Sequence, residues 1–126
     1  MLRTLFFHSI AIAALIAPSV AQDAAKKFDL SLLYVGKPGE ARAKAFEGFF
    51  KKHVRKVTVA PLDGSAVGLA SDADVVVLDW PQGGPDVFDE KKKPLGERAD
   101  WNKPTVLLGS SGLMLSSGWR LRGGFG

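Results

Sequence analysis

The chain contains no cysteine, and this absence excludes several kinds of chemistry. Disulfide bonds and thiol nucleophiles are not available to it. A lipoprotein-type lipid anchor is also excluded, because no cysteine follows the apolar segment near the N-terminus. Stability must therefore come from a packed core, and 126 residues allow one small domain at most.

Histidine is rare in the sequence, and the net charge is small. The sequence has two histidines and a formal net charge of +4. His53 lies beside Lys52 at the end of a predicted helix, where a histidine is more often a C-terminal cation than a general base. The lysines and arginines are scattered, with no aromatic ladder or groove motif among them, which argues against nucleic acid as a partner.

The first residues have the pattern of an export signal. Arg3 supplies a positive start, residues 5–17 form an apolar stretch, and small residues end at Ala21. This stretch is shorter than the roughly 20 residues that cross a bilayer comfortably. We therefore predict a signal peptide over residues 1–21 and a polar leader over 22–27. The protein is expected to be periplasmic or extracellular, without a stable membrane anchor after cleavage.

Four apolar segments predict β-strands. The clearest is residues 75–78, an unbroken and largely β-branched run that ends at Asp79, Trp80 and Pro81. A continuous apolar run is typical of a strand covered on both faces. The other predicted strands span residues 29–35, 56–62 and 105–108, and the last of these is also expected to be buried on both faces.

Helices are predicted between these strands. Residues 40–54 form the strongest candidate, and five apolar side chains at helical spacing are expected to face the sheet: Ala41, Ala45, Phe46, Phe49 and Phe50. A second helix within 63–70 has room for two turns only, and its glycines weaken it. Residues 81–103 are predicted to be a long loop, and a further helix is expected to start within 113–119.

This order of elements predicts an α/β fold with a parallel sheet. We expect a single flavodoxin-like three-layer sandwich over residues 28–126, with strand order 2-1-3-4 and the topological switch point between the first and third strands. A fourth strand buried on both faces would need a following helix and usually a fifth strand. The glycine-rich residues 122–126 provide neither, so the sequence predicts a fold incomplete at its C-terminus, in a fragment of a longer protein.

A binding crevice is predicted where the carboxyl ends of the strands meet, at residues 36–40, 79–84 and 109–112. Backbone N–H groups of the turn at 36–39 could hold an anion, although this turn is neither a dinucleotide fingerprint nor a P-loop. An aromatic face beside amide and carboxylate groups suits a sugar or another small polar ligand. Alternatively, the tryptophan rings fill gaps in a thin covering layer. The candidate ligand-binding residues are Gly36, Lys37, Gly39, Asp79, Trp80 and Gln82.

Catalytic and metal sites are weakly supported. Asp79 lacks the acidic pair that a phospho-acceptor of the receiver-domain type needs, and we expect it to cap the following loop or order its backbone amides. Ser110 or Ser111 would need a base to act as a nucleophile, and no histidine follows His53. No cofactor is predicted and no metal site, since the acidic residues 79, 86, 89 and 90 lack motif spacing and Lys91 to Lys93 would compete for them.

Three segments carry a family resemblance. Residues 32–39, 73–80 and 103–109 resemble exported members of the class I glutamine amidotransferase-like superfamily, in particular its trehalose-utilisation (ThuA-like) branch. The resemblance implies a flavodoxin-like sandwich. In that branch the nucleophilic cysteine is often absent, and here its place at the turn 109–112 holds serines. No catalytic residue can therefore be transferred.

Three functions follow as alternatives. The first is an exported, non-catalytic α/β domain that binds a small polar or carbohydrate ligand at the carboxyl edge of the sheet. The second is a serine-dependent hydrolase that uses Ser110 or Ser111. The third is a secreted interaction module that uses the long loop. The sequence does not indicate an oligomeric state.

Overall fold

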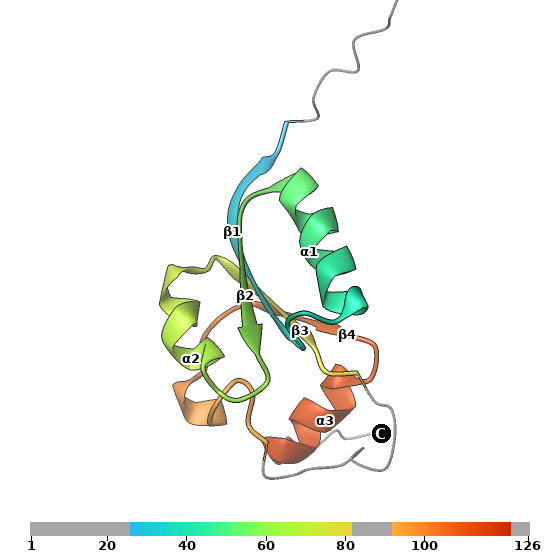
Figure 1. The fold of residues 1–126 in the computed structure, drawn as a ribbon. Coiled ribbons are helices and arrows are strands. Elements are labelled where there is room, and N and C mark those ends of the chain that lie inside the picture. The colour runs from blue at the N-terminus through green and yellow to red at the C-terminus, as the bar shows by residue number, and fades with distance from the viewer. Residues whose placement is uncertain (1–25, 82–91, 122–126) are drawn as a thin grey trace, which may run out of the picture.

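A computed structural model describes residues 26–81 and 92–121 (Figure 1). The predicted signal peptide, most of the polar leader, Gln82 and the acidic residues 86, 89 and 90 lie outside these ranges. Within the two ranges, no helix has the length and apolar character needed to cross a membrane.

Four strands form one sheet, and every pair is parallel. They are β1 (Phe28–Gly36), β2 (Val54–Pro61), β3 (Val75–Asp79) and β4 (Thr105–Leu108), in the order β2-β1-β3-β4. The predicted α/β class, parallel sheet and strand order are thus confirmed. From Ser31 onward β1 is buried, and β3 is nearly so, because layers cover both faces of these central strands.

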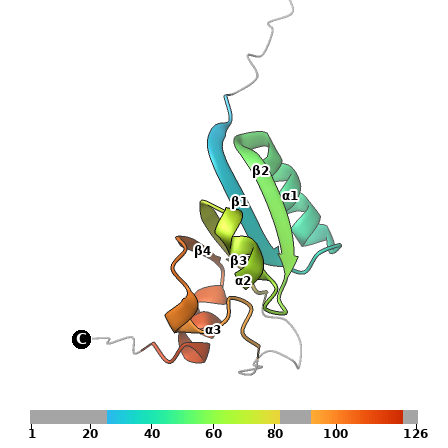
Figure 2. The same cartoon turned by 90° about the vertical axis from the view of Figure 1, so that its left-hand side faces the viewer.

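The helices form the outer layers of a flavodoxin-like sandwich. Helix α1 (Ala41–His53) packs on one face of the sheet, whereas α2 (Ala66–Leu69) and α3 (Ser111–Gly118) pack on the other. Figures 1 and 2 show α1 and α2 on opposite sides of β1 and β2. Two short 3-10 turns complete the described elements, at Ala70–Asp72 and Arg98–Asp100.

The inner face of α1 differs from the prediction. Ala43 is the buried residue of this helix, and Phe46 and Phe50 are partly buried against the sheet. Phe49 is 55% exposed, so its predicted core position is wrong. Ala41 and Ala45 are exposed as well. The small side chain at 43 allows close approach of the helix, and the contact stripe then follows positions 43, 46, 47 and 50.

The fourth strand also differs from the prediction. Val106 is 49% exposed and Leu107 is 41% exposed, so β4 is not buried on both faces. In the described part of the chain, β4 pairs with β3 only and forms an edge of the sheet. The apolar run 105–108 therefore marked a strand but not a central one.

Part of the predicted long loop belongs to the core. Leu95 is fully buried, and Trp80 and Trp101 are buried beside it in the layer that holds α2 and α3. The Nε1 of Trp101 donates to Thr105 Oγ1 at 2.9 Å, and the Nε1 of Trp119 donates to Gly96 O at 2.8 Å. Tryptophan rings thus fill a layer in which the regular helices are short.

Candidate functional site

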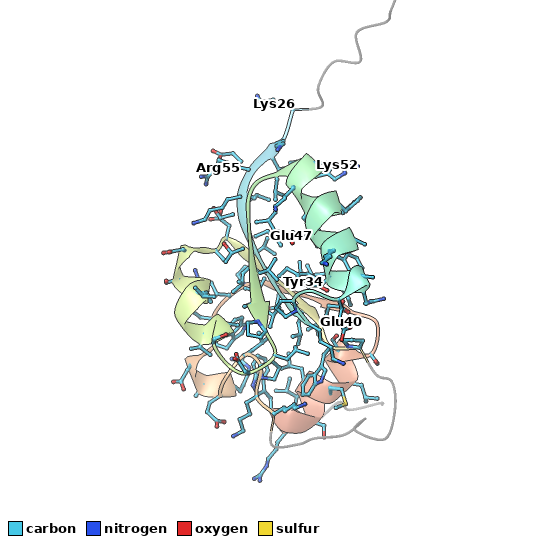
Figure 3. The ribbon with its side chains drawn as sticks, viewed as in Figure 1. Lys26, Tyr34, Glu40, Glu47, Lys52 and Arg55 are labelled. Atoms are coloured by element: carbon cyan, nitrogen blue, oxygen red, sulfur yellow. The ribbon has the colours of Figure 1, made fainter. Side chains whose placement is uncertain are left out.

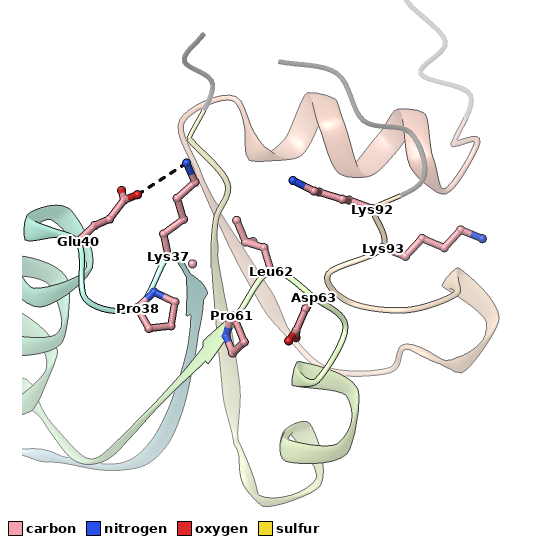
Figure 4. A pocket seen from close by; sticks show the side chains of 9 residues that line it. Lys37, Pro38, Glu40, Pro61, Leu62, Asp63, Lys92 and Lys93 are labelled. Atoms are coloured by element: carbon pink, nitrogen blue, oxygen red, sulfur yellow. Dashed lines mark ion pairs between the residues drawn. The ribbon is translucent and has the colours of Figure 1, made fainter. Parts of the chain in front are cut away.

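At the carboxyl edge of the sheet, a cavity lies at the ends of β1 and β2 (Figure 4). Its volume is about 640 Å³, and it is lined by Gly36, Lys37, Pro38, Glu40, Pro61, Leu62, Asp63, Lys92 and Lys93. Of the predicted ligand-binding residues, Gly36 and Lys37 line it. Gly39, Asp79 and Trp80 do not, and Gln82 lies outside the described residues.

The turn after β1 is shaped by two glycines. A Cβ on Gly36 would lie 2.7 Å from the ring of Tyr34, so no larger residue fits beside that buried ring. Gly39 has a φ of 87°, a left-handed conformation that favours glycine, and α1 begins two residues later. The two glycines therefore permit the tight turn that joins β1 to the start of α1 beside the cavity.

Charged side chains surround the cavity. Three lysines and two carboxylates line it, an excess of one positive charge. Lys37 Nζ lies 3.8 Å from Glu40 Oε1, and Lys93 forms an ion pair with Glu97. Lys92 extends from the far side of the cavity toward Leu62 (Figure 4). Asp63 accepts a hydrogen bond of 2.9 Å from the backbone N–H of Ser65, and hydrogen bonding from Ser65 lowers the pKa of that carboxyl.

Asp79 lies outside this cavity, in a buried polar cluster on the α1 side of the sheet. Its carboxylate is 2% exposed. Tyr34 Oη donates to Oδ2 at 2.6 Å, Arg42 Nε donates to the same oxygen at 2.7 Å, and Arg42 Nη2 donates to Oδ1 at 3.0 Å. Both oxygens are thus engaged by side chains of β1 and α1, instead of the loop amides expected from the sequence.

The cluster changes the acidity of its members. Burial, followed by the hydrogen bond to Asp79, raises the pKa of Tyr34 well above its ordinary value near 10. The hydrogen bond from Arg42 to Asp79 raises the pKa of the guanidinium. Tyr34 lies on the α1 side of the sheet (Figure 3), where its ring stacks on Phe46 at 5.9 Å between centroids. A tyrosine held neutral in this way is a donor to the carboxylate and not a base.

We expect the protein to lose stability above pH 10 through Tyr34. The unfolded chain releases the phenolic proton near its ordinary pKa of about 10, while the folded chain retains it. The free energy of unfolding should therefore be unaffected by this group below pH 10 and fall by up to about 1.4 kcal/mol per pH unit above it.

Tyr34 is the only tyrosine, so tyrosinate absorbance reports this residue alone. The native protein should show no tyrosinate signal at a pH where the urea-unfolded protein is fully ionised. A native titration midpoint near 10, with circular dichroism unchanged, would contradict the raised pKa.

The two candidate serines occupy different environments. Ser111 is fully buried; its Oγ accepts a hydrogen bond of 2.7 Å from the Trp80 N–H and donates one of 2.7 Å to Leu108 O. Ser110 is exposed at the N-cap of α3 and makes no side-chain capping bond. Ser111 thus joins the ends of β3 and β4, and its hydroxyl is not directed to a ligand.

The histidine in the described part of the chain, His53, is not placed to act as a base for these serines. His53 ends α1 directly before β2 begins, whereas Ser111 follows the end of β4. Since the strands are parallel, the amino end of β2 and the carboxyl end of β4 lie at opposite edges of the sheet. Among the residues that the structure describes, no group of three or more His, Asp or Glu side chains could hold a metal ion.

Comparisons with protein-family models, with curated proteins and with solved structures found no match for this chain. The flavodoxin-like architecture therefore stands on the strand order and the layers described above.

Proposed function

We propose that this chain is an exported, non-catalytic binding domain for a small polar ligand that carries a negative charge. The observation that supports this most directly is the cavity of about 640 Å³ at the ends of β1 and β2, with lysines on both sides. In open parallel α/β sheets, ligands bind outside the carboxyl ends of the strands. Lys37 and Lys92 would hold the anionic group.

The character of the cavity wall favours an anion over a sugar bound by stacking. The described lining residues include no aromatic side chain, and Trp80 is buried in the core on the α2 and α3 side of the sheet. Glu40 and Asp63 can accept hydrogen bonds from ligand hydroxyls. A sugar acid or a sugar phosphate would combine both kinds of group.

Two sequence features extend the proposal. The charged and apolar pattern that ends at Ala21 supports export. The segments 32–39, 73–80 and 103–109 support kinship with the class I glutamine amidotransferase-like superfamily and its ThuA-like branch. An experimental structure of a ThuA-like protein with a strand order other than 2-1-3-4 would contradict the proposed kinship with that branch.

The test is a calorimetric titration of protein recovered from the exported fraction, whose mass also gives the cleavage site. The ligands are glucose, glucose 6-phosphate, gluconate and inorganic phosphate. We expect the anionic ligands to bind and glucose not to bind. Lys37→Ala and Lys92→Ala should each weaken binding about tenfold, the usual scale for a charge-assisted hydrogen bond.

Lys52→Ala is the matched control, because Lys52 is an exposed lysine in the last turn of α1 (Figure 3). It should bind with unchanged affinity. Equal weakening in all three variants would indicate a general charge effect and contradict the assigned cavity. Chain found only in the cytoplasm with residues 1–21 attached would contradict export.

A further inference from the structure

The outer edge of β4 has backbone groups with no strand beside them in the described part of the chain. The Val76 N–H donates to Pro104 O at 2.9 Å, which fixes the phase of the ladder between β3 and β4. In a parallel pair the residues alternate, so Val106 directs its N–H and C=O toward β3. Thr105 and Leu107 direct theirs outward.

Within the described residues, this edge has one protective feature, its length of only four residues, and lacks the others that usually protect an exposed strand. Lysines, prolines within the strand and bulges commonly prevent pairing between edges. The strand Thr105–Leu108 has no charged residue. The adjacent lysine, Lys103, is turned back, and its Nζ donates to Ala73 O at 2.9 Å and Ser71 O at 3.2 Å. No described charge therefore protects the edge.

The side chains of the edge are apolar and exposed. Val106 points to the α1 side of the sheet, since it is in register with Val77 of the cluster under α1. It is 49% exposed, and Leu107 on the opposite face is 41% exposed. Helix α1 packs on β1 and β2, so Val106 has no helix above it among the described elements.

We propose that β4 pairs antiparallel with β4 of a second copy of this chain, about a two-fold axis through Val106. In this register Thr105 of each copy lies opposite Leu107 of the other, and their outward groups form about four backbone hydrogen bonds. The two Val106 side chains meet on the α1 side. Because β4 has no charged residue, two copies of it can lie side by side without repulsion between like charges. The two-fold axis places the α1 layers of both copies on one face of a continuous sheet and the α2 and α3 layers on the other.

The size of the contact limits its strength. A strand of four residues buries less surface than the roughly 1,200 Å² of a standard interface. The dimer should therefore dissociate in the micromolar range, at about 1–100 μM, and exchange subunits readily.

Single cysteines test the register, because the natural chain has none. Val106→Cys should form a disulfide-linked dimer under mild oxidation, since a directly opposed, non-hydrogen-bonded pair has Cα atoms about 4.5 Å apart. Leu107→Cys should not, because its two copies would lie diagonally at about 7–8 Å. Leu69→Cys, a 42% exposed position on α2, is the control and should stay monomeric.

Sedimentation equilibrium tests the association itself. Val106→Lys should raise the dimer dissociation constant at least about tenfold, because like charges would then lie directly opposite. Leu69→Lys, with the same change in charge and similar exposure, should leave the constant unchanged. Circular dichroism of each variant checks that the fold is retained.

Three outcomes would overturn the proposal. One is a chain that stays monomeric up to about 500 μM. Another is a dimer that survives Val106→Lys, which would locate the interface elsewhere. The third is cross-linking through Leu107→Cys but not Val106→Cys, which would exclude the axis through Val106.

Discussion

Replacement of Asp79 by alanine is expected to lower the free energy of unfolding by about 3 kcal/mol. The carboxylate is 2% exposed and accepts hydrogen bonds from both Tyr34 and Arg42. Its removal leaves the buried Tyr34 hydroxyl without this acceptor and deletes a bidentate charged pair. The loss stays moderate because the Arg42 side chain is 51% exposed and can be hydrated when its partner is gone.

Urea denaturation of three further variants separates the contributions. Tyr34→Phe should cost about 1 kcal/mol, because only one hydrogen bond is lost and the ring remains. Arg42→Ala should cost more than Tyr34→Phe, because it leaves the 2% exposed carboxylate without its charged partner. Asp79→Asn should fall between Tyr34→Phe and Asp79→Ala. A loss below about 1 kcal/mol for Asp79→Ala would contradict a structural role for the cluster.

The sheet could be predicted from the sequence because its signals are local. Val75 to Leu78 form an unbroken apolar run, which is typical of parallel central strands, and glycine- or proline-containing turns end the predicted strands. The strand order follows from general rules for α/β folds, and the structure agrees with it.

The side-chain contacts of Tyr34 and Asp79 could not be predicted from local signals, because they depend on the register between β1 and β3. Tyr34 and Asp79 lie on adjacent strands, and only the pairing of Val35 with Leu78 brings their side chains to the same face and end of the sheet. A signal was present in the sequence: Tyr34 is the one tyrosine, and its neighbours Leu32, Leu33 and Val35 are apolar. A buried hydroxyl needs a partner, and a carboxylate at the end of the neighbouring strand is a natural acceptor.

The position of the cavity could not be predicted from local sequence patterns either. The crevice was predicted at residues 36–40, 79–84 and 109–112, and of these segments the described lining of the cavity at the ends of β1 and β2 includes only residues of 36–40. Lys92 reaches it from a segment more than fifty residues away from Lys37 in sequence. The inner face of α1 shifted for a similar reason, because Ala43 permits close packing that hydrophobicity alone does not indicate.

Replacement of Ser111 by alanine is expected to cost about 2 kcal/mol, far more than the same change at its neighbour. The hydroxyl of Ser111 bonds both the Trp80 N–H and Leu108 O, so its removal leaves a donor and an acceptor without this partner at the junction of β3 and β4. Ser110→Ala should change the free energy of unfolding by less than about 0.5 kcal/mol, because Ser110 is exposed and makes no capping bond. Urea denaturation of the two variants gives a comparison in which residue type and location are matched.

The same pair separates a structural serine from a nucleophilic one. A fluorophosphonate probe attacks only an accessible and activated hydroxyl, and Ser111 is fully buried with its proton donated to a carbonyl. We therefore expect no labelling of the folded protein. Labelling that is lost in Ser111→Ala or Ser110→Ala, with the fold intact by circular dichroism, would show that the serine is accessible and is activated by a base outside this turn. In that case the hydrolase alternative would replace the non-catalytic proposal, because a hydroxyl held in two buried hydrogen bonds cannot at the same time be the accessible nucleophile that the probe requires.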